Sequence, residues 1–285
     1  MLRAIYQSTM KSPTKFIAYF LSSIPIVIAP NTTIVHIFPF GGAVGYRPRV
    51  QNVFSEYQHH VVFIAYCGNH VNYKYTKRGS KMKKLIIEVG ANDGREVERL
   101  LAQFPDAHYY GFEPTLELYN NLIKMFGHID RVNFYPIAIS NYNGFATFNV
   151  AGQGDWGCSS LFNFPDNIHD IWPNRPDFTT SHRYKVPVMK MSLFLDNYIN
   201  EDFEIEYAWI DAQGSDLNVL ASFEHHLNKI KVGRVEVSNR VELYTGTNNT
   251  INNAMDLLDN NGYIYNVHYI YGQMGPEVDV EFFKK

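Results

Sequence analysis

Residues 85–94 read LIIEVGANDG, an apolar run with an acid near its end, followed by two glycines four positions apart. Gly90 and Gly94 allow positive φ angles and a close approach of the backbone to a ligand. The apolar run is typical of a strand buried on both faces, so the glycines fall in the turn after it. Taken alone, the stretch fits an ordinary strand-to-helix turn as well as a cofactor-binding loop.

An acid about 20 residues further on favours the cofactor loop. Glu113 follows the apolar run 108–112, where a carboxylate is placed to accept hydrogen bonds from ribose hydroxyls. The dinucleotide fingerprint G-x-G-x-x-G is absent, and the loop carries Asp93. An acidic loop disfavours pyrophosphate. It suits a cofactor without phosphate that has a cationic amino-acid end, such as S-adenosylmethionine.

The elements that must position these residues alternate along the chain from Met82 onward. We expect strands at 85–89, 108–112, 132–139, 146–150, 207–210, 231–237, 263–271 and 277–283, and helices at 96–104, 116–126, 192–198, 215–227 and 251–260. Repeated strand–helix units predict an α/β fold with a mostly parallel sheet and helices on both faces. The last two strands are joined by a tight turn at 272–276, so they must be antiparallel.

Polar residues gather directly after the predicted strands. In an open parallel sheet, ligands bind outside the carboxyl ends of the strands. The residues at these positions are Glu88, Gly90, Asn92, Asp93 and Gly94 after the first strand, Glu113 after the second, Ser140 after the third, and Asp211, Gln213 and Glu236 after later ones. Their convergence predicts a binding site at this edge of the sheet, with the first seven as cofactor contacts.

Residues 151–184 interrupt the alternation with glycines, prolines and aromatic residues. A connection of this length in a compact domain is usually functional or disordered, and the aromatic content argues against disorder. We interpret it as a lid or substrate loop. Trp156, Trp172 and Tyr184 could stack on a sugar or an apolar acceptor, or they could pack the lid onto the core.

Six segments follow one another over roughly residues 84–240: IIEVGANDG, YYGFEPTLELYNNL, PIAISNYNGFATFNV, GCSSL, VPVMKMSLFLDNYI and WIDAQGSDLNVL. Taken together, they resemble the FkbM-type methyltransferases. These enzymes are S-adenosylmethionine-dependent O-methyltransferases with a Rossmann-like, seven-stranded class I sheet. The resemblance implies cofactor contacts from Glu88, Gly90, Asn92 and Glu113, and it implies roles near the reacting centre for Asp211, Gly214, Ser159 and Ser160.

Two positions depart from the family pattern K-I-D-x-E-G. Trp209 stands where lysine is common, and Gln213 stands where glutamate is common. The loss of the glutamate removes a hard anion from any Mg²⁺ site and leaves Asp211 and Glu236 as weak candidate ligands. We therefore predict no metal at the site.

Methyl transfer from a sulfonium to a hydroxyl requires in-line positioning and a base that removes the proton. Asp211, at a strand end beside the cofactor loop, is the first candidate base. His182 and His169 in the lid are alternatives, because histidine titrates near neutrality. The predicted acceptor contacts are Ser159, Ser160, Trp156 and Gln213. A further pair, His225–His226, is expected on the solvated face of the 215–227 helix.

Composition and the N-terminal segment limit the partners. The chain has 285 residues, 46% of them apolar, and a net charge of −3, so nothing favours a nucleic-acid partner. Residues 16–30, FIAYFLSSIPIVIAP, resemble a signal-peptide core or a short anchor, but the run is short for a membrane span and contains Pro25. We predict a cytoplasmic protein, with membrane anchoring or secretion through 16–30 as the alternative. We also predict an appendage at 1–81 and a methyltransferase domain at 82–285.

The sequence as a whole predicts an S-adenosylmethionine-dependent O-methyltransferase that acts on a hydroxyl of a small molecule or glycan. A non-catalytic module that binds a nucleoside cofactor or a glycan is an alternative, because Trp209 and Gln213 could mark lost chemistry. An NAD-dependent dehydrogenase is disfavoured by the missing glycine pattern.

Overall fold

The computed structural model describes residues 17–21, 24–28, 37–38, 64–65, 82–152 and 156–285, in two compact units, Met1–Tyr73 and Lys74–Lys285. In the first unit, β1 (Ile17–Leu21) pairs antiparallel with β2 (Ile24–Ile28), and β3 (Ile37–Phe38) pairs parallel with β4 (Ile64–Ala65). No helix in the described ranges is long and apolar enough to cross a membrane. The other residues of the predicted appendage at 1–81 lie outside the described residues. Both the appendage and the start of the methyltransferase domain at Met82 stay predictions.

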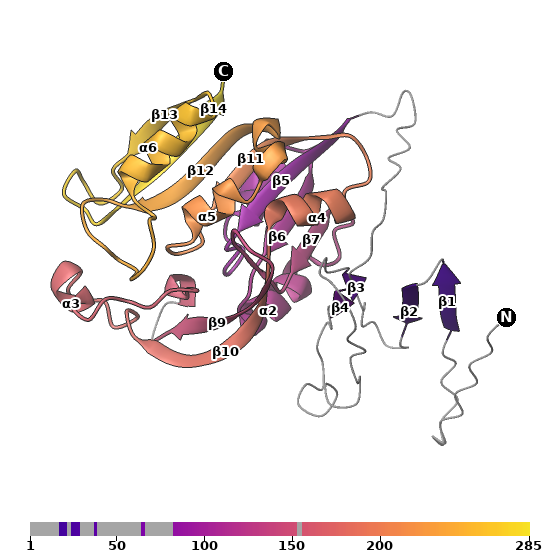
Figure 1. Ribbon diagram of the computed structural model, residues 1–285, viewed down its shortest axis with the longest axis horizontal. Helices are drawn as coiled ribbons and strands as arrows, with labels where there is room; N and C mark the ends of the chain where they lie inside the picture. The colour runs from indigo at the N-terminus through magenta and orange to yellow at the C-terminus, as the bar shows by residue number, and fades with distance from the viewer. Residues whose placement is uncertain (1–16, 22–23, 29–36, 39–63, 66–81, 153–155) are drawn as a thin grey trace, which may run out of the picture. The chain divides into compact units, whose positions relative to one another are not determined.

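The second unit is built around a seven-stranded sheet with the order β13-β14-β12-β11-β5-β6-β7 (Figure 1). Its strands are β5 (Lys83–Val89), β6 (His108–Phe112), β7 (Val132–Tyr135), β11 (Phe203–Ile210), β12 (Ile230–Ser238), β13 (Tyr263–His268) and β14 (Glu277–Lys284). All neighbours are parallel except β14, which runs antiparallel to both β12 and β13. The predicted fold class, a mostly parallel sheet with an antiparallel final strand, is confirmed.

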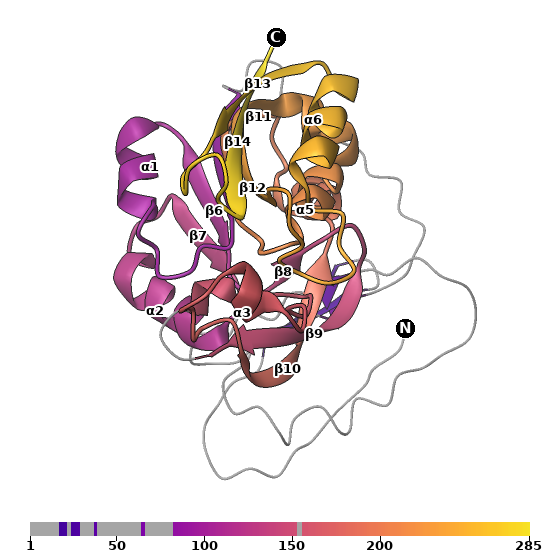
Figure 2. The same ribbon diagram turned by 90° about the vertical axis from the view of Figure 1, so that its left-hand side faces the viewer.

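Helices cover both faces of the sheet. They are α1 (Val97–Gln103), α2 (Leu116–Phe126), α4 (Met191–Tyr198), α5 (Asp216–Ala221) and α6 (Ile251–Asn260). Figure 2 shows α1 and α2 on one side of the sheet and α5 and α6 on the other. In α2, Leu118, Leu122 and Phe126 are buried at spacings of four, which is the stripe that a helix packed on a sheet requires.

The order of the strands places a reversal at the middle of the sheet. The chain runs outward from β5 through β6 to β7 and then returns to β11, on the other side of β5. Adjacent strands whose connections leave in opposite directions open a crevice at their carboxyl ends, where ligands bind in open α/β sheets. The loops after β5, β6 and β11 therefore face one another across this crevice.

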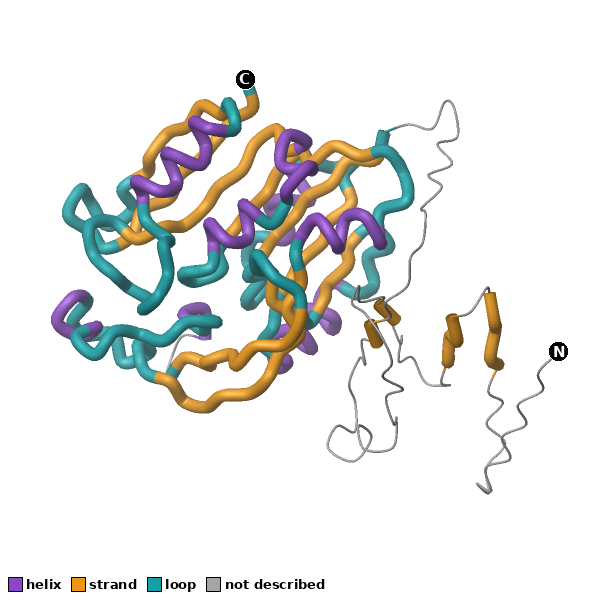
Figure 3. The backbone as a smooth tube through the Cα atoms, in the orientation of Figure 1, coloured by secondary structure: helices purple, strands orange, loops and turns teal. Residues whose placement is uncertain are grey.

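A second, three-stranded sheet corrects the prediction of one strand at 132–139. The chain breaks at Pro136, which has no N–H to donate, and β8 (Ala138–Ile139) pairs instead with β10 (Thr180–Met189). β10 also pairs with β9 (Gly144–Ala151), whereas the sequence predicted no strand at 180–189. In Figure 3 the long β9–β10 ribbon lies apart from the main sheet, on the side where its carboxyl-end loops gather.

The predicted helix at 215–227 is also wrong, because the structure divides it. α5 ends at Ala221, and a separate 3-10 segment, η3 (Glu224–Lys229), follows. Glu224 has a φ of 50°, which no α-helix accommodates. The Ser222 hydroxyl between the two segments donates to the Val219 carbonyl and accepts from the Met191 N–H, so the break is held by hydrogen bonds.

The segment predicted as a lid forms a small core of its own with the chain after β12. It contains η2 (Trp156–Cys158), α3 (Ile168–Ile171) and the start of β10. Cys158, Ile168 and Phe178 are buried together with Leu243 and Tyr244. Trp172 packs edge-on against Tyr271 with ring centroids 4.9 Å apart, so this aromatic residue anchors the segment.

Glu88 is a buried acid on β5, in the main sheet. Its side chain is 2% exposed and accepts a hydrogen bond from the Tyr109 hydroxyl. Burial raises the pKa of Glu88 to about 8, and the neighbouring Glu96 and Asp211 act in the same direction. The carboxyl group therefore holds its proton at pH values where the unfolded chain has lost it.

We expect Glu88→Gln to stabilise the protein above neutral pH and to have little effect near pH ~5. Wild-type stability falls as the pH rises from the unfolded value of 4.5 to about 8, because the native state binds the extra proton. Glutamine does not titrate, so the difference grows across that window by about 1.4 kcal/mol per pKa unit. Urea unfolding across the window measures it, and a difference that is independent of pH contradicts the assignment.

Candidate active site

A cleft with about 550 Å³ of empty space opens at the carboxyl ends of β5, β6 and β11. Its lining includes Gly90 and Asn92 from the loop after β5, Glu113 from the loop after β6, and Asp211 and Gln213 from the loop after β11. Residues of β8, β9 and η2 close the opposite wall.

Gly90 brings the two central loops into contact. Its φ is 85°, and a Cβ added to it would lie 1.9 Å from the backbone oxygen of Asp211. The Asp211 N–H donates to the Val89 carbonyl at 2.9 Å, which holds the two loops at this separation. No residue with a side chain fits here without moving one of the loops.

Glu113 is a carboxylate held in one orientation. It is 4% exposed, and its two oxygens accept the N–H groups of Asn92 at 2.9 Å and Thr115 at 2.6 Å. Burial raises the pKa of Glu113, while the hydrogen bonds from Thr115 and Asn92 oppose that rise. Each carboxylate oxygen has a second lone pair, so both can still accept hydrogen bonds from neighbouring hydroxyls of a ligand.

Gln213 bridges two carboxylates behind the cleft. Its Nε2 donates to Asp211 Oδ1 at 2.6 Å and to Glu236 Oε1 at 2.9 Å. The hydroxyl of the buried Tyr244 donates to Gln213 Oε1 at 2.5 Å, which determines which end of the amide faces the acids. The amide therefore gives each of the two acids one hydrogen bond without adding a further negative charge.

This bridge does not fit a divalent cation. The amide nitrogen lies between Asp211 and Glu236, where a bridging Mg²⁺ would have to lie. Burial and the Asp211 charge raise the pKa of Glu236. Within the described ranges, no group of three histidine, cysteine or carboxylate ligands converges on the cleft. We derive no metal chemistry here.

Three of the predicted cofactor residues, Gly90, Asn92 and Glu113, line the cleft. Asp93 is exposed and forms an ion pair with Arg95 at 2.9 Å. The Ser140 hydroxyl is buried against that of Ser215 at 3.2 Å. The residues that do not line the cleft are Glu88, Asp93, Gly94 and Ser140. The sequence suggested the Asp93 carboxylate as a partner for a cationic cofactor, but in the structure this carboxylate pairs with Arg95.

The predicted acceptor residues connect the lid segment to the cleft. Trp156 lines the cleft and is 41% exposed. The Ser159 hydroxyl donates to the Trp156 carbonyl at 2.5 Å and accepts from the Ala151 N–H at 3.0 Å. The Ser160 hydroxyl donates to the Gln213 carbonyl at 2.6 Å. The two serines therefore hold the lid segment in place, and Trp156 is the residue of this set with a largely accessible side chain.

Of the three candidate bases, only Asp211 lines the cleft. His182 is exposed on β10, where its ring stacks on Tyr184 at 5.8 Å and its Nδ1 lies 3.0 Å from the Ser181 hydroxyl. His169 is exposed on the short helix α3. Neither histidine faces the site.

Sequence reasoning missed Tyr244 and the apolar wall of the cleft. The wall consists of Ile137, Ala138, Ile139, Phe148 and Leu161. Ile137, Ala138 and Ile139 lie at the end of the predicted strand 132–139, and that position was the signal that could have found them. Tyr244 lies in an irregular segment, where no local pattern indicates a role.

The reversed β14 between β12 and β13, together with a ligand cleft at the β5–β11 reversal, defines the class I methyltransferase fold. The family model for the methyltransferase FkbM domain matches residues 88–265. The chain therefore belongs to the FkbM methyltransferase family.

Three comparisons give the distance to named proteins. The 2-O-methyltransferase NoeI of Sinorhizobium fredii is 29% identical over 174 residues, which are 58% of this chain and 68% of NoeI. A tRNA (guanine-N(7)-)-methyltransferase of Aquifex aeolicus is 28% identical over 109 residues, 38% of this chain and 32% of that protein. The structure of a precorrin-6y C5,15-methyltransferase from Geobacter metallireducens is 11% identical with a TM-score of 0.34, covering 72% of this chain and 82% of that one.

We expect Gly90→Ala to destabilise the fold by about 2–4 kcal/mol, because it combines an unfavourable φ with a clash against the Asp211 backbone. Gly246→Ala is the matched control: Gly246 also has a positive φ, 75°, but a Cβ there would meet nothing within 4 Å. It should cost only about 1–2 kcal/mol. Urea unfolding compares the two variants, and equal losses would show that the contact between the loops contributes nothing.

Proposed function

We propose that this methyltransferase moves the methyl group of S-adenosylmethionine to a hydroxyl of a small molecule or sugar. The observation that carries the proposal is the fixed Glu113 carboxylate opposite the Gly90–Asp211 contact. A carboxylate with two oriented oxygens suits the vicinal hydroxyls of a ribose, and a glycine at this point allows backbone approach to a ligand. Membership of the FkbM family supports the same reading.

The residues of the cleft suit the parts of this cofactor. Glu113 would accept hydrogen bonds from the ribose, and Gly90 and Asn92 would approach the amino-acid end through their backbone. Ile137, Ile139 and Phe148 give an apolar surface for the base. When bound, S-adenosylmethionine supplies an electrophilic methyl group on a sulfonium, so the chain needs to supply orientation and a proton acceptor.

Asp211 is the base that we propose. It lines the cleft, and the hydrogen bond from Gln213 Nε2 fixes its Oδ1. A base is needed for a hydroxyl acceptor, because an alcohol keeps its proton at neutral pH. The name of NoeI, a 2-O-methyltransferase, supports an oxygen acceptor.

A sugar is the acceptor class that the mouth of the cleft favours. The exposed ring of Trp156 offers a flat apolar face beside the polar loop residues, an arrangement that suits the apolar face and the hydroxyls of a pyranose. The net charge of −3 and the acids around the cleft give no electrostatic attraction for a nucleic-acid backbone.

The two departures from the family pattern are accommodated by the structure around them. The guanidinium groups of Arg99 and Arg234 lie 5.3 Å and 4.6 Å from the Trp209 ring centroid, which is a cation–π arrangement. Gln213 orients Asp211 through its amide. Both residues have a structural role beside the cleft, which is consistent with a working enzyme.

The test separates cofactor binding from turnover in the full chain. Incubation with S-adenosylmethionine and a panel of sugars should form S-adenosylhomocysteine with at least one acceptor. We expect Asp211→Asn to lower kcat by about 10²–10⁴-fold with cofactor affinity kept, since a general base contributes that much. Glu113→Gln should instead weaken cofactor binding about tenfold or more.

Asp256→Asn, at an exposed acid on α6, is the control for an Asp-to-Asn change and should alter neither quantity. Unchanged turnover in Asp211→Asn would remove this residue from the mechanism. Absence of any product with every acceptor, despite cofactor binding, would favour a binding module instead.

We also expect Tyr244→Phe to lower kcat by about 3–30-fold with the cofactor affinity unchanged, because the Gln213 amide loses the hydrogen bond that orients it toward Asp211. Tyr263→Phe is the matched control: the Tyr263 hydroxyl is also buried and donates to the carbonyls of Leu227 and Ile230, at 2.6 Å and 3.1 Å. Both variants should lose about 1–2 kcal/mol of stability. An equal fall of kcat in both would show that Tyr244 is only structural.

A further inference from the structure

A cluster of metal-ligating side chains lies outside the cleft. Asp196, near the end of α4, and His225 and His226 of η3 each offer one ligand atom, and these atoms all lie within 4.8 Å of one another. Among the residues that the structure describes, this is the one group of three such ligands that converges. The methyl-transfer site uses none of them.

The burial of His226 contradicts the expectation of a solvated pair. His226 is 2% exposed, and its ring packs against Phe203 with centroids 5.2 Å apart. The side chains of His225 and Asp196 are 60% and 36% exposed. The cluster therefore has one rigid, buried ligand and one open side that an ion and its water can reach.

The spacing of the ligand atoms fits a small divalent ion. Asp196 Oδ1 lies 2.9 Å from His226 Nε2 and 3.4 Å from His225 Nε2. Tetrahedral zinc, with bonds of about 2.0–2.2 Å, places its ligand atoms roughly 3.3–3.6 Å apart. The distance from Asp196 to His226 is shorter than that range, and the distance from Asp196 to His225 lies within it. A small outward shift of the side chains would therefore admit the ion.

We propose that Asp196, His225 and His226 form a zinc site, with the fourth position open to water. Two imidazoles and one carboxylate are borderline ligands that suit Zn²⁺, whereas Mg²⁺ and Ca²⁺ select oxygen. Three protein ligands with an exposed fourth position are sufficient for zinc. The ligands come from two separate elements, so the ion would join α4 to η3.

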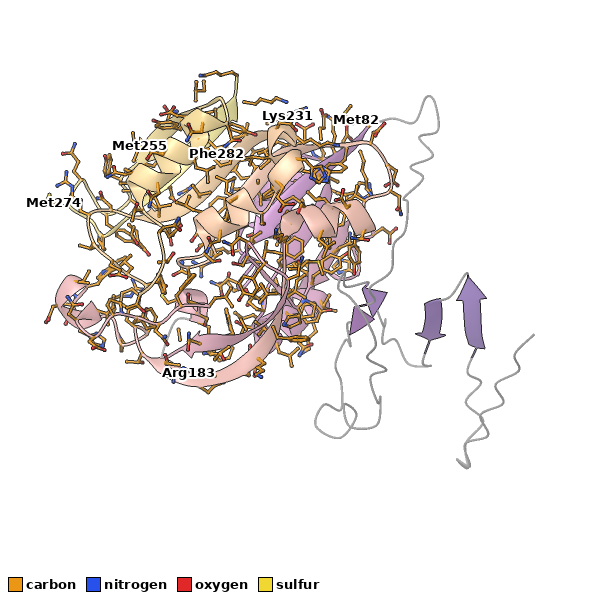
Figure 4. All side chains as sticks on the ribbon, in the orientation of Figure 1. Met82, Arg183, Lys231, Met255, Met274 and Phe282 are labelled. Atoms are coloured by element: carbon orange, nitrogen blue, oxygen red, sulfur yellow. The ribbon has the colours of Figure 1, made fainter. Side chains whose placement is uncertain are left out.

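The place of the site in the fold indicates a structural role. α4 and η3 lead into β11 and β12, so the cluster lies at the starts of these strands, whereas the cleft lies at their carboxyl ends. Figure 4 shows the two ends of the sheet: Lys231, directly after η3, lies far from Arg183 of the β9–β10 ribbon. Glu224 already joins the same two elements, since it accepts from Lys190 at 2.8 Å and Ser192 at 2.7 Å.

The surroundings of His226 also limit the affinity. Its Nδ1 is buried and has no hydrogen-bond partner. Binding through Nε2 requires the ring proton to reside on Nδ1, where no acceptor receives it. Partners of this kind contribute about 10–100-fold to metal affinity, so we expect zinc to bind that much more weakly than at a closed structural site.

The full chain, stripped with a chelator and dialysed, would be titrated with Zn²⁺ against a chromophoric competitor. We expect Asp196→Asn and His225→Ala each to lose one equivalent of zinc relative to wild type, or to bind it at least tenfold more weakly. His128→Ala, which removes an exposed histidine at the end of α2, is the control and should keep that equivalent. Zinc bound elsewhere in the chain is common to all variants, so the difference reports this site.

Thermal unfolding gives a second readout that does not depend on methyl transfer. Added Zn²⁺ should raise the Tm of wild type and of His128→Ala more than that of Asp196→Asn, because an ion that binds only the native state stabilises it. Equal stoichiometry and affinity in wild type, Asp196→Asn and His225→Ala would overturn the proposal and leave the cluster as a hydrogen-bonded triad.

Discussion

The close approach of two loops at the centre of the sheet is the constraint on which the site depends. Gly90 lies against the backbone oxygen of Asp211, at a distance that excludes any side chain. Through this contact, the ends of β5 and β11 are held at one separation, and Asp211, the proposed base, lies beside the loop after β5. Asn92, two residues further on, donates its backbone N–H to Glu113 and so joins the loop after β5 to the end of β6. Loop geometry, rather than a large set of side chains, therefore assembles the cleft.

The acids around the cleft create the second constraint. Asp216 and Glu277 lie beneath the loop after β11, and burial followed by the charge of Asp211 raises the pKa of both, that of Glu277 to about 8. A further anion at position 213 would add to this repulsion. The Gln213 amide carries no charge and donates hydrogen bonds to Asp211 and Glu236. Glutamine therefore suits this position among the acids.

The sequence predicted the main sheet well because its signals are local. α2 and α6 have the predicted bounds, since an apolar stripe, a helix start and a turn coincide in each. Glu113 and Asp211 were found because the fold rule places ligands after parallel strands. β10 was missed because its first half is exposed and polar and its partners are distant in sequence. His226 was misassigned because its burial depends on the break after α5, which no periodic pattern reveals.

The lid segment shows the same division between local and distant signals. Its aromatic content indicated order, and the structure packs Phe178 with Tyr244 into one small core. Which aromatic residue faces the cleft depends on that packing. Trp172 turns to the hairpin loop at Tyr271, whereas Trp156 lines the cleft. The sequence named Trp156 as an acceptor contact, and Trp156 does line the cleft, but it left open which of the lid's aromatic residues pack onto the core.

We propose that the cleft binds S-adenosylmethionine through Glu113 and the Gly90 loop. The decisive experiment is a calorimetric titration of the full chain with S-adenosylmethionine and, in parallel, with NAD. One S-adenosylmethionine should bind per chain and NAD should not bind, because the loop lacks the G-x-G-x-x-G pattern that receives a pyrophosphate. Binding of NAD, or the absence of S-adenosylmethionine binding, would contradict it.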